Sequence, residues 1–182
     1  MGASGRFVLR IDPSLHEALR AAAAAAGVSL NEYCARRLTL PDSPGAGPFG
    51  EVIARAAGQF GAALRGVVAY GSWVRGELGD GSDVDVMVVV SEGVALERGL
   101  YREWDERPLE MEGRRIEAHL VHLPAEGARV TGLWAELALD GVVLHDPGLE
   151  VSRRLVSIRH RIVAGEVVRR EVHGQAYWIH AA

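Results

Sequence analysis

Two aspartates, Asp83 and Asp85, stand two positions apart at the start of an apolar run, residues 86–90. Residues two apart on a strand project from the same face, so a strand here would present both carboxylates together. Carboxylate oxygens on a rigid element suit Mg²⁺ or Mn²⁺, which keep waters and take triphosphate oxygens as further ligands. The pair therefore predicts a divalent-metal site that binds a nucleoside triphosphate. The alternative is a polar turn that leads into a strand.

A candidate phosphate-binding corner precedes the aspartates. Gly71 and Ser72 directly follow an apolar stretch that we expect to be a buried strand. Glycine lets the backbone approach a phosphate closely, and Ser72 offers a hydroxyl at the start of a short helical turn. Arg75 on that turn would face the triphosphate, because the chain contains no lysine to do so. The alternative for Arg75 is a surface ion pair with Glu77 or Asp80.

The order of these features resembles the minimal nucleotidyltransferases of the DNA polymerase beta superfamily. The features are a strand, Gly71-Ser72, Arg75-Gly76, Ser82-Asp83-Val84-Asp85 and a second apolar strand, within about residues 50–145. The resemblance implies a mixed sheet flanked by helices, and two metal ions held by three carboxylates. It also implies in-line attack of an acceptor hydroxyl on the α-phosphorus of an NTP such as ATP, with pyrophosphate leaving. The nucleotide-binding residues that it implies are Gly71, Ser72, Arg75 and Ser82.

The third carboxylate of that family lies on a neighbouring strand, and Glu117 is the best match for it. Residues 114–123 are an expected strand without aspartate, and Glu117 shares one of its faces with His119. The resemblance thus implies that Asp83, Asp85 and Glu117 are metal ligands and catalytic residues, with Glu117 also acting as a base. Two alternatives stay open. His119 is the metal's neighbour instead, or Glu117 is an exposed edge-strand residue in a site that binds nucleotide but transfers poorly.

The length of the chain and the positions of its Pro and Gly residues indicate how it is divided into parts. Its 182 residues fit one domain with a smaller one attached. A segment rich in Pro and Gly, residues 41–49, is typical of a linker between a head, residues 1–40, and a body, residues 50–182. We expect an α+β protein, and the pattern assigns nothing to residues 165–182. In the body, apolar periodicity predicts helices at 51–64, 127–139 and 150–164, and strands at 66–70, 84–90, 114–123 and 142–145.

The head resembles a ribbon-helix-helix domain of the antitoxin type. Residues 6–11 alternate like a strand, one helix is expected after Asp12-Pro13, and Ser29 to Glu32 form a capping box for a second. Such domains pair strands from two chains in the DNA major groove, which implies a homodimer that binds operator DNA. A head that only dimerises is the alternative, because it is modestly basic. The residues implied for DNA binding are Arg6, Val8, Arg10, Ser29 and Asn31.

The composition of the chain disfavours several classes of protein. A net charge of −4 does not favour a protein that coats nucleic acid by bulk charge. The single cysteine, Cys34, permits neither an internal disulfide nor a multi-cysteine zinc site. No stretch is apolar enough for a membrane span or an export signal, so we expect a cytoplasmic protein.

Three functions remain open on the sequence. The two resemblances together imply transfer of AMP to a toxin protein by a DNA-binding, antitoxin-like regulator. A second candidate is transfer to a small molecule, such as an aminoglycoside hydroxyl, which would need an acidic acceptor pocket. The third is a DNA-binding antitoxin with a decayed, inactive transferase site.

Overall fold

The chain divides into two compact units, Met1–Leu40 and Pro41–Ala182. The computed structural model describes residues 8–25, 29–38, 48–77, 79, 81–172 and 175–181. Most of the segment expected to be a linker lies outside this part of the chain. Its last two residues, Pro48 and Phe49, already belong to a helix.

The first unit contains two helices in its described part, α1 (Pro13–Ala25) and α2 (Leu30–Leu38). Asp12 stands just before α1, and its carboxylate accepts a hydrogen bond from the Ser14 amide at 2.8 Å. The Ser29 hydroxyl accepts one from the Glu32 amide at 3.1 Å, which is half of the expected capping box. Both helices therefore begin where the sequence predicts.

The strand expected at residues 6–11 is not formed in the described residues 8–11, which have no regular structure. Val8 is 91% exposed and Arg10 is also exposed. A single short strand is not stable alone and needs a second strand to pair with. Ser29 and Asn31 are exposed as well, whereas Arg6 lies outside the described residues.

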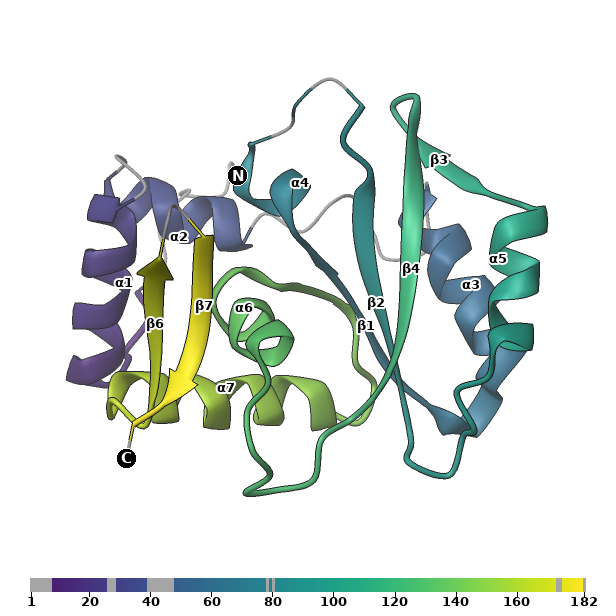
Figure 1. The fold of residues 1–182 in the computed structure, drawn as a ribbon. Helices are drawn as coiled ribbons and strands as arrows, with labels where there is room; N and C mark the ends of the chain where they lie inside the picture. Colours follow the sequence, from purple (N-terminus) through teal and green to yellow (C-terminus); the bar gives the residue numbers. More distant parts are fainter. Residues whose placement is uncertain are drawn as a thin grey trace. The chain divides into compact units, whose positions relative to one another are not determined.

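The second unit is built on a five-stranded sheet of order β3-β4-β2-β1-β5 (Figure 1). β2 pairs with β4 in parallel and with β1 antiparallel, so the expected mixed sheet is confirmed. The predictions for residues 84–90 and 142–145 have the observed bounds, and the other two are close. The strands are β1 (Leu64–Tyr70), β2 (Val84–Val90), β3 (Leu109–Met111), β4 (Arg114–His122) and β5 (Val142–His145).

Helices cover both faces of this sheet (Figure 1). On one face, Val52 and Ala56 of α3 and Trp104 of α5 pack on the even-numbered valines of β2. On the other face, Leu137 of α6 and Leu155 of α7 pack on Met87 and Val89. Burial on both sides explains why β2 is almost wholly apolar. The helices are α3 (Pro48–Phe60), α4 (Ser72–Arg75), α5 (Arg102–Glu106), α6 (Gly132–Asp140) and α7 (Glu150–Val163), with 3-10 turns η1 (Gly61–Ala63) and η2 (Arg98–Tyr101).

Two predicted helix boundaries were wrong. The helix expected at 51–64 ends at Phe60, and Leu64 already belongs to β1. The helix expected from residue 127 begins at Gly132, because Thr131 is its N-cap. The Thr131 hydroxyl accepts a hydrogen bond from the Trp134 amide at 3.4 Å, which satisfies one of the free amides at the helix start.

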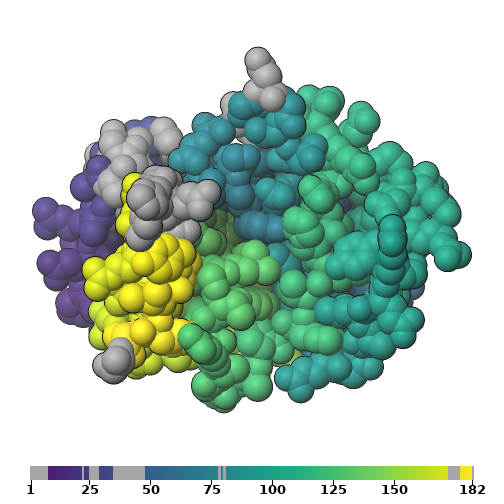
Figure 2. Space-filling view, viewed as in Figure 1, coloured from purple at the N-terminus to yellow at the C-terminus, as the bar shows by residue number. Residues whose placement is uncertain are grey.

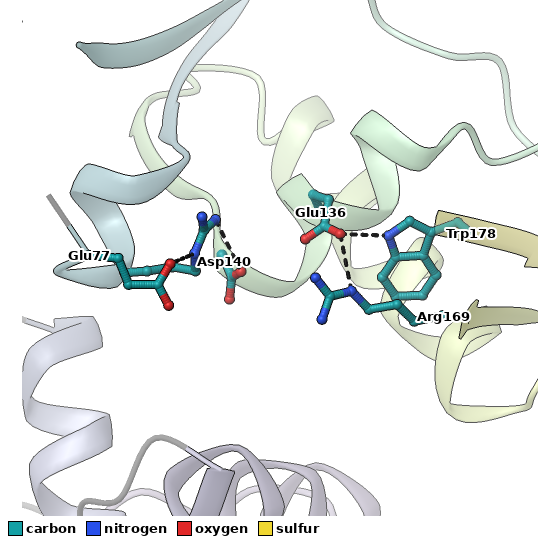
Figure 3. A network of polar contacts seen from close by, with 6 residues as sticks. Glu77, Glu136, Asp140, Arg169 and Trp178 are labelled. Atoms are coloured by element: carbon teal, nitrogen blue, oxygen red, sulfur yellow. Dashed lines mark hydrogen bonds and ion pairs between the residues drawn. The ribbon is translucent and has the colours of Figure 1, made fainter. Parts of the chain in front are cut away.

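The C-terminal residues, which the sequence pattern left unassigned, form a hairpin of β6 (Val167–Val172) and β7 (Gln175–His180). Trp178 Nε1 donates to Glu136 Oε1 of α6 at 2.8 Å, and Arg169 Nε lies 3.4 Å from the same oxygen (Figure 3). The hairpin is thereby held on α6. None of the helices in the described ranges is long and apolar enough to cross a membrane.

Candidate active site

Three polar side chains meet at one end of the central sheet because of its strand register. Tyr70, the last residue of β1, pairs with Asp85, and Asp85 pairs in turn with Glu117 of β4. All three share the sheet face that α6 and α7 cover further along. Asp85 is half-buried at this end and Glu117 is exposed. Two of the expected carboxylates therefore lie side by side on neighbouring strands.

Gly71 lies directly against the carboxylate of Asp85. Its backbone has φ 80° and ψ −159°, a conformation that residues with a side chain rarely adopt. A Cβ built on Gly71 would overlap the Asp85 carboxylate. The glycine expected to approach a phosphate thus also makes room for the aspartate.

Helix α4 begins at Ser72 and is fixed to the core by its middle residues. Trp73 meets Phe49 of α3 edge-on, with 5.2 Å between the ring centroids, and Val74 packs in the same core. Gly76 ends the helix with φ 71°, in the left-handed conformation common after a helix. Ser72 is therefore held beside Gly71 at the edge of the site.

Arg75 is ion-paired rather than free. Its Nε lies 2.6 Å from Glu77 Oε2, and its Nη1 lies 3.9 Å from Asp140 Oδ2 at the end of α6 (Figure 3). The hydrogen bond to Glu77 is the largest cause that raises the pKa of Arg75. The ion pair with Glu77, one alternative read from the sequence, is thus present. Arg75 still acts on the site, because its charge lowers the pKa of Asp85.

Ser82 closes the turn that leads into Asp83. Its hydroxyl accepts a hydrogen bond from the Gly79 amide at 3.0 Å, and its own amide donates to the Gly79 carbonyl at 3.2 Å. Arg114 Nη1 donates to the carbonyls of Gly79 and Ser82 at 2.9 and 3.0 Å. Sequence reasoning missed Arg114, since its acceptors are backbone oxygens that no side-chain pattern reveals. Asp83 follows this turn and is exposed.

The pKa of Asp85 is raised by burial and by other carboxylates. Burial is the largest cause that raises its pKa, and the negative charges of Glu117 and Asp83 raise it further. His119 and Arg75 act in the opposite direction. Two of the carboxylates expected from the sequence, Asp83 and Glu117, therefore act electrostatically on the third, Asp85.

Tyr70 and His119 extend the site along β4. The Tyr70 hydroxyl and His119 Nδ1 are hydrogen-bonded, and His119 Nε2 lies 3.6 Å from Glu117 Oε1. Burial, followed by the charges of Asp85 and Glu117, raises the pKa of Tyr70, so its hydroxyl stays protonated. The sequence analysis named His119 as a candidate site residue but not Tyr70, because Tyr70 is the last residue of an apolar stretch.

A divalent cation fits the chemistry of this donor set. Asp83, Asp85 and Glu117 supply hard oxygen donors, and a cation would offset both the burial and the repulsion that raise the pKa of Asp85. Within the described ranges, no group of three or more His, Cys, Asp and Glu side chains is already arranged to hold a metal. Nucleotide and metal would therefore complete the coordination together.

Residues 53–134 match the family model described as the nucleotidyltransferase domain. Over this range the second unit is similar to a nucleotidyltransferase domain. This domain match runs from α3 into α6 and includes Gly71, Asp83, Asp85 and Glu117. The match supports a transferase of the nucleotidyl-transferring kind.

Other comparisons cover the head and the whole chain. Residues 2–38 match the model of the HicB family. No curated protein matches the chain significantly. A crystal structure of a toxin–antitoxin with AMP-PNP is similar at 16% identity, over 62% of this chain and 85% of that one, with a TM-score of 0.43. A mutant of the toxin–antitoxin MntA-HpeT is similar at 13% identity, over 64% and 87%, with a TM-score of 0.42.

Proposed function

We propose that the second unit transfers AMP from ATP to an acceptor hydroxyl. The oxygen of the acceptor forms a bond to the α-phosphorus, the bond from that phosphorus to the bridging oxygen of the β-phosphate breaks, and pyrophosphate leaves. The observation that carries this proposal is the register of Asp85 with Glu117, inside residues that match a nucleotidyltransferase domain.

Mg²⁺ or Mn²⁺ would be held by Asp83, Asp85 and Glu117, and when bound it would offset charge on the phosphates and lower the pKa of the acceptor hydroxyl. Gly71 and Ser72 bring the start of α4 to the triphosphate, where backbone amides meet phosphate oxygens. Arg75 would leave Glu77 to bind the same phosphates.

Glu117 would accept the proton that the acceptor hydroxyl loses. Its side chain is 51% exposed and therefore accessible to an acceptor. His119, hydrogen-bonded to Tyr70 and 3.6 Å from Glu117, would orient that carboxylate. Tyr70 and His119 are thus positioning residues in this scheme.

Labelled ATP separates this proposal from a decayed site. Wild-type protein with α-labelled ATP and Mg²⁺ should release pyrophosphate and label an acceptor, and the D83N/D85N double variant should do neither. The control is D105N, which removes one exposed carboxylate outside the site. That carboxylate lies 3.3 Å from Arg115. Undiminished transfer by the double variant would contradict the assignment.

We propose a partner protein, of the toxin type, as the acceptor. This rests on the resemblance of both parts of the chain to antitoxin-type proteins. An acidic pocket for a cationic small molecule has less support, because Glu136 and Asp140 of α6 already face Arg169 and Arg75 (Figure 3). Label that appears in a co-expressed neighbouring protein would support the first acceptor, and label in an aminoglycoside would support the second.

We also propose that the first unit is a ribbon-helix-helix head that dimerises and binds operator DNA. The exposed Val8 and Arg10 and the HicB-family match of residues 2–38 support it. Arg6 and Arg10 would donate to guanine edges, Val8 would touch a thymine methyl, and Ser29 and Asn31 would bind a phosphate. A salt-dependent gel shift on the upstream region should be lost in R6A/R10A and kept in R20A, which removes an exposed arginine of α1.

A further inference from the structure

A small basic cavity lies in the second unit between helix α7 and the loop that joins β4 to α6. Its volume is about 110 Å³. Arg129, Arg154 and Arg161 line it together with the hydroxyl residues Thr131 and Ser157, and its lining contains no aspartate or glutamate. The green segment that contains this loop lies at the surface in the lower part of Figure 2. The loop residues Ala125, Glu126 and Gly127 are exposed. The cavity is therefore open to solvent and rich in hydrogen-bond donors.

One wall of the cavity is a single face of α7. Arg154, Ser157 and Arg161 are spaced three and four residues apart, so their side chains project along one side of the helix. Arg161 is fixed in place: its Nη1 donates to the Ala128 carbonyl at 2.8 Å, and its Nε donates to Glu166 at 3.0 Å. Arg161 thereby ties the loop to the helix and shapes the cavity.

The other two arginines, Arg129 and Arg154, differ from Arg161 in this respect. Within the described part of the chain, neither Arg129 nor Arg154 pairs with a carboxylate. Guanidinium groups around one concavity repel one another, and an anion would offset that repulsion. The planar fork of an arginine matches two oxygens of a phosphate, and such charge-assisted hydrogen bonds are among the strongest in proteins.

We propose that this cavity binds a phosphate-type oxyanion at a site separate from the transferase centre. A nucleotide pocket usually has about 300–1,000 Å³, so this cavity takes a phosphate group but not a whole nucleotide. Thr131 is the N-cap of α6 and Asp140 is its last residue, and the nine residues of the helix span roughly 13 Å. The cavity and the Arg75–Asp140 edge of the active site are thus at opposite ends of one helix.

Calorimetric titration of the full-length protein with inorganic phosphate tests the proposal, with metal and nucleotide left out and ionic strength held constant with chloride. We expect saturable binding that the R129Q/R154Q variant weakens by about tenfold or more. The control, R98Q/R170Q, loses the same charge from two exposed positions outside the cavity and should bind like wild type. The single variant R129Q, in the exposed loop, repeats the test should the double variant fail to fold.

Two further titrations test where the phosphate binds and whether it is free or part of a larger ligand. Phosphate binding should persist in D83N/D85N, which distinguishes this site from the transferase centre whether or not transfer occurs. AMP that binds with the same arginine dependence supports a phosphate carried by a larger ligand, and binding of phosphate alone supports the free ion. Equal affinity in wild type and R129Q/R154Q, or no binding of either probe up to about 10 mM, overturns the proposal.

Discussion

Asp85 and Glu117 lie directly opposite each other in the parallel pairing of β2 with β4. Each follows a buried residue of its strand, Val84 and Ile116, so both side chains point to the same face of the sheet. One face at one strand end thus holds two carboxylates, and their mutual repulsion helps to raise the pKa of Asp85.

This arrangement makes Glu117 testable by a change of one atom. In E117Q, the amide keeps the shape of the side chain but can neither accept the proton of an acceptor nor bind a cation as strongly. We expect kcat to fall by about 10²–10⁴-fold while ATP still binds. Transfer assays and ATP titrations measure the two effects. The control is E110Q on the exposed part of β3, and equal kcat for wild type and E117Q would reduce Glu117 to a surface residue.

Gly71 offers a second test with a matched control. G71A places a Cβ at φ 80° and into the Asp85 carboxylate, whereas G76A places one at φ 71° with no atom within 4 Å. Both should lose roughly 1–3 kcal/mol of stability from the strained backbone. Only G71A should also lose transfer activity, by about 100-fold, because it displaces Asp85. Urea unfolding and pyrophosphate release separate the two effects, and similar activity in both variants would show that the contact does not matter.

Much of the core could be predicted from the sequence because apolar periodicity is a local signal. Residues 84–90 are apolar at nearly every position, as a strand covered on both faces must be, and Gly71-Ser72 marks the turn that precedes them. The place of Glu117 came from alternation within residues 114–123 together with a family resemblance. Its register with Asp85 is a long-range property that periodicity does not encode.

The parts that escaped prediction depend on contacts between distant segments. Arg114 binds carbonyls of the turn at Gly79 and Ser82, and nothing in its neighbours distinguishes it from Arg115. The C-terminal hairpin had a signal that went unused, since His173-Gly174 separates two stretches with strand-forming residues. The hydrogen bond that attaches the hairpin to Glu136 of α6 could not be predicted from the spacing of residues in the sequence.

Asp85 should limit the stability of the metal-free protein. Its pKa in the folded state is raised, so the folded state binds this proton more tightly than the unfolded chain does. Stability is therefore lost as pH rises from the unfolded pKa, about 3.9, through the folded pKa. D85N has no such proton and avoids the loss. At neutral pH without divalent metal, we expect its Tm to be higher by about 2–4 °C.

Thermal unfolding in a chelator at several pH values measures this effect. The advantage of D85N over wild type should grow with pH across the same window and then level off. D105N, which loses an exposed carboxylate, should show no comparable gain. A D85N protein that is no more stable than wild type at neutral pH would mean that burial and neighbouring carboxylates do not strain the site.

Arg114 should tune the binding of nucleotide rather than the chemical step. Its guanidinium donates to the carbonyls of Gly79 and Ser82, and this holds the turn that presents Asp83. In R114Q both hydrogen bonds are lost, so Asp83 must be ordered by the incoming metal and triphosphate. We expect KM for ATP to rise by about 5- to 10-fold with kcat changed much less, since the ordering free energy is taken from binding.

Steady-state transfer measured over a series of Mg²⁺ concentrations distinguishes this role from direct catalysis. R115Q is the control, because Arg115 is the next residue of β4 but faces Asp105 at 3.3 Å instead of the turn. Higher Mg²⁺ should partly restore R114Q, because the metal binds the ordered form of Asp83 and shifts the turn toward it. If R114Q instead lowers kcat at unchanged KM, Arg114 acts on the transition state, and the hydrogen-bonded turn is not what it contributes.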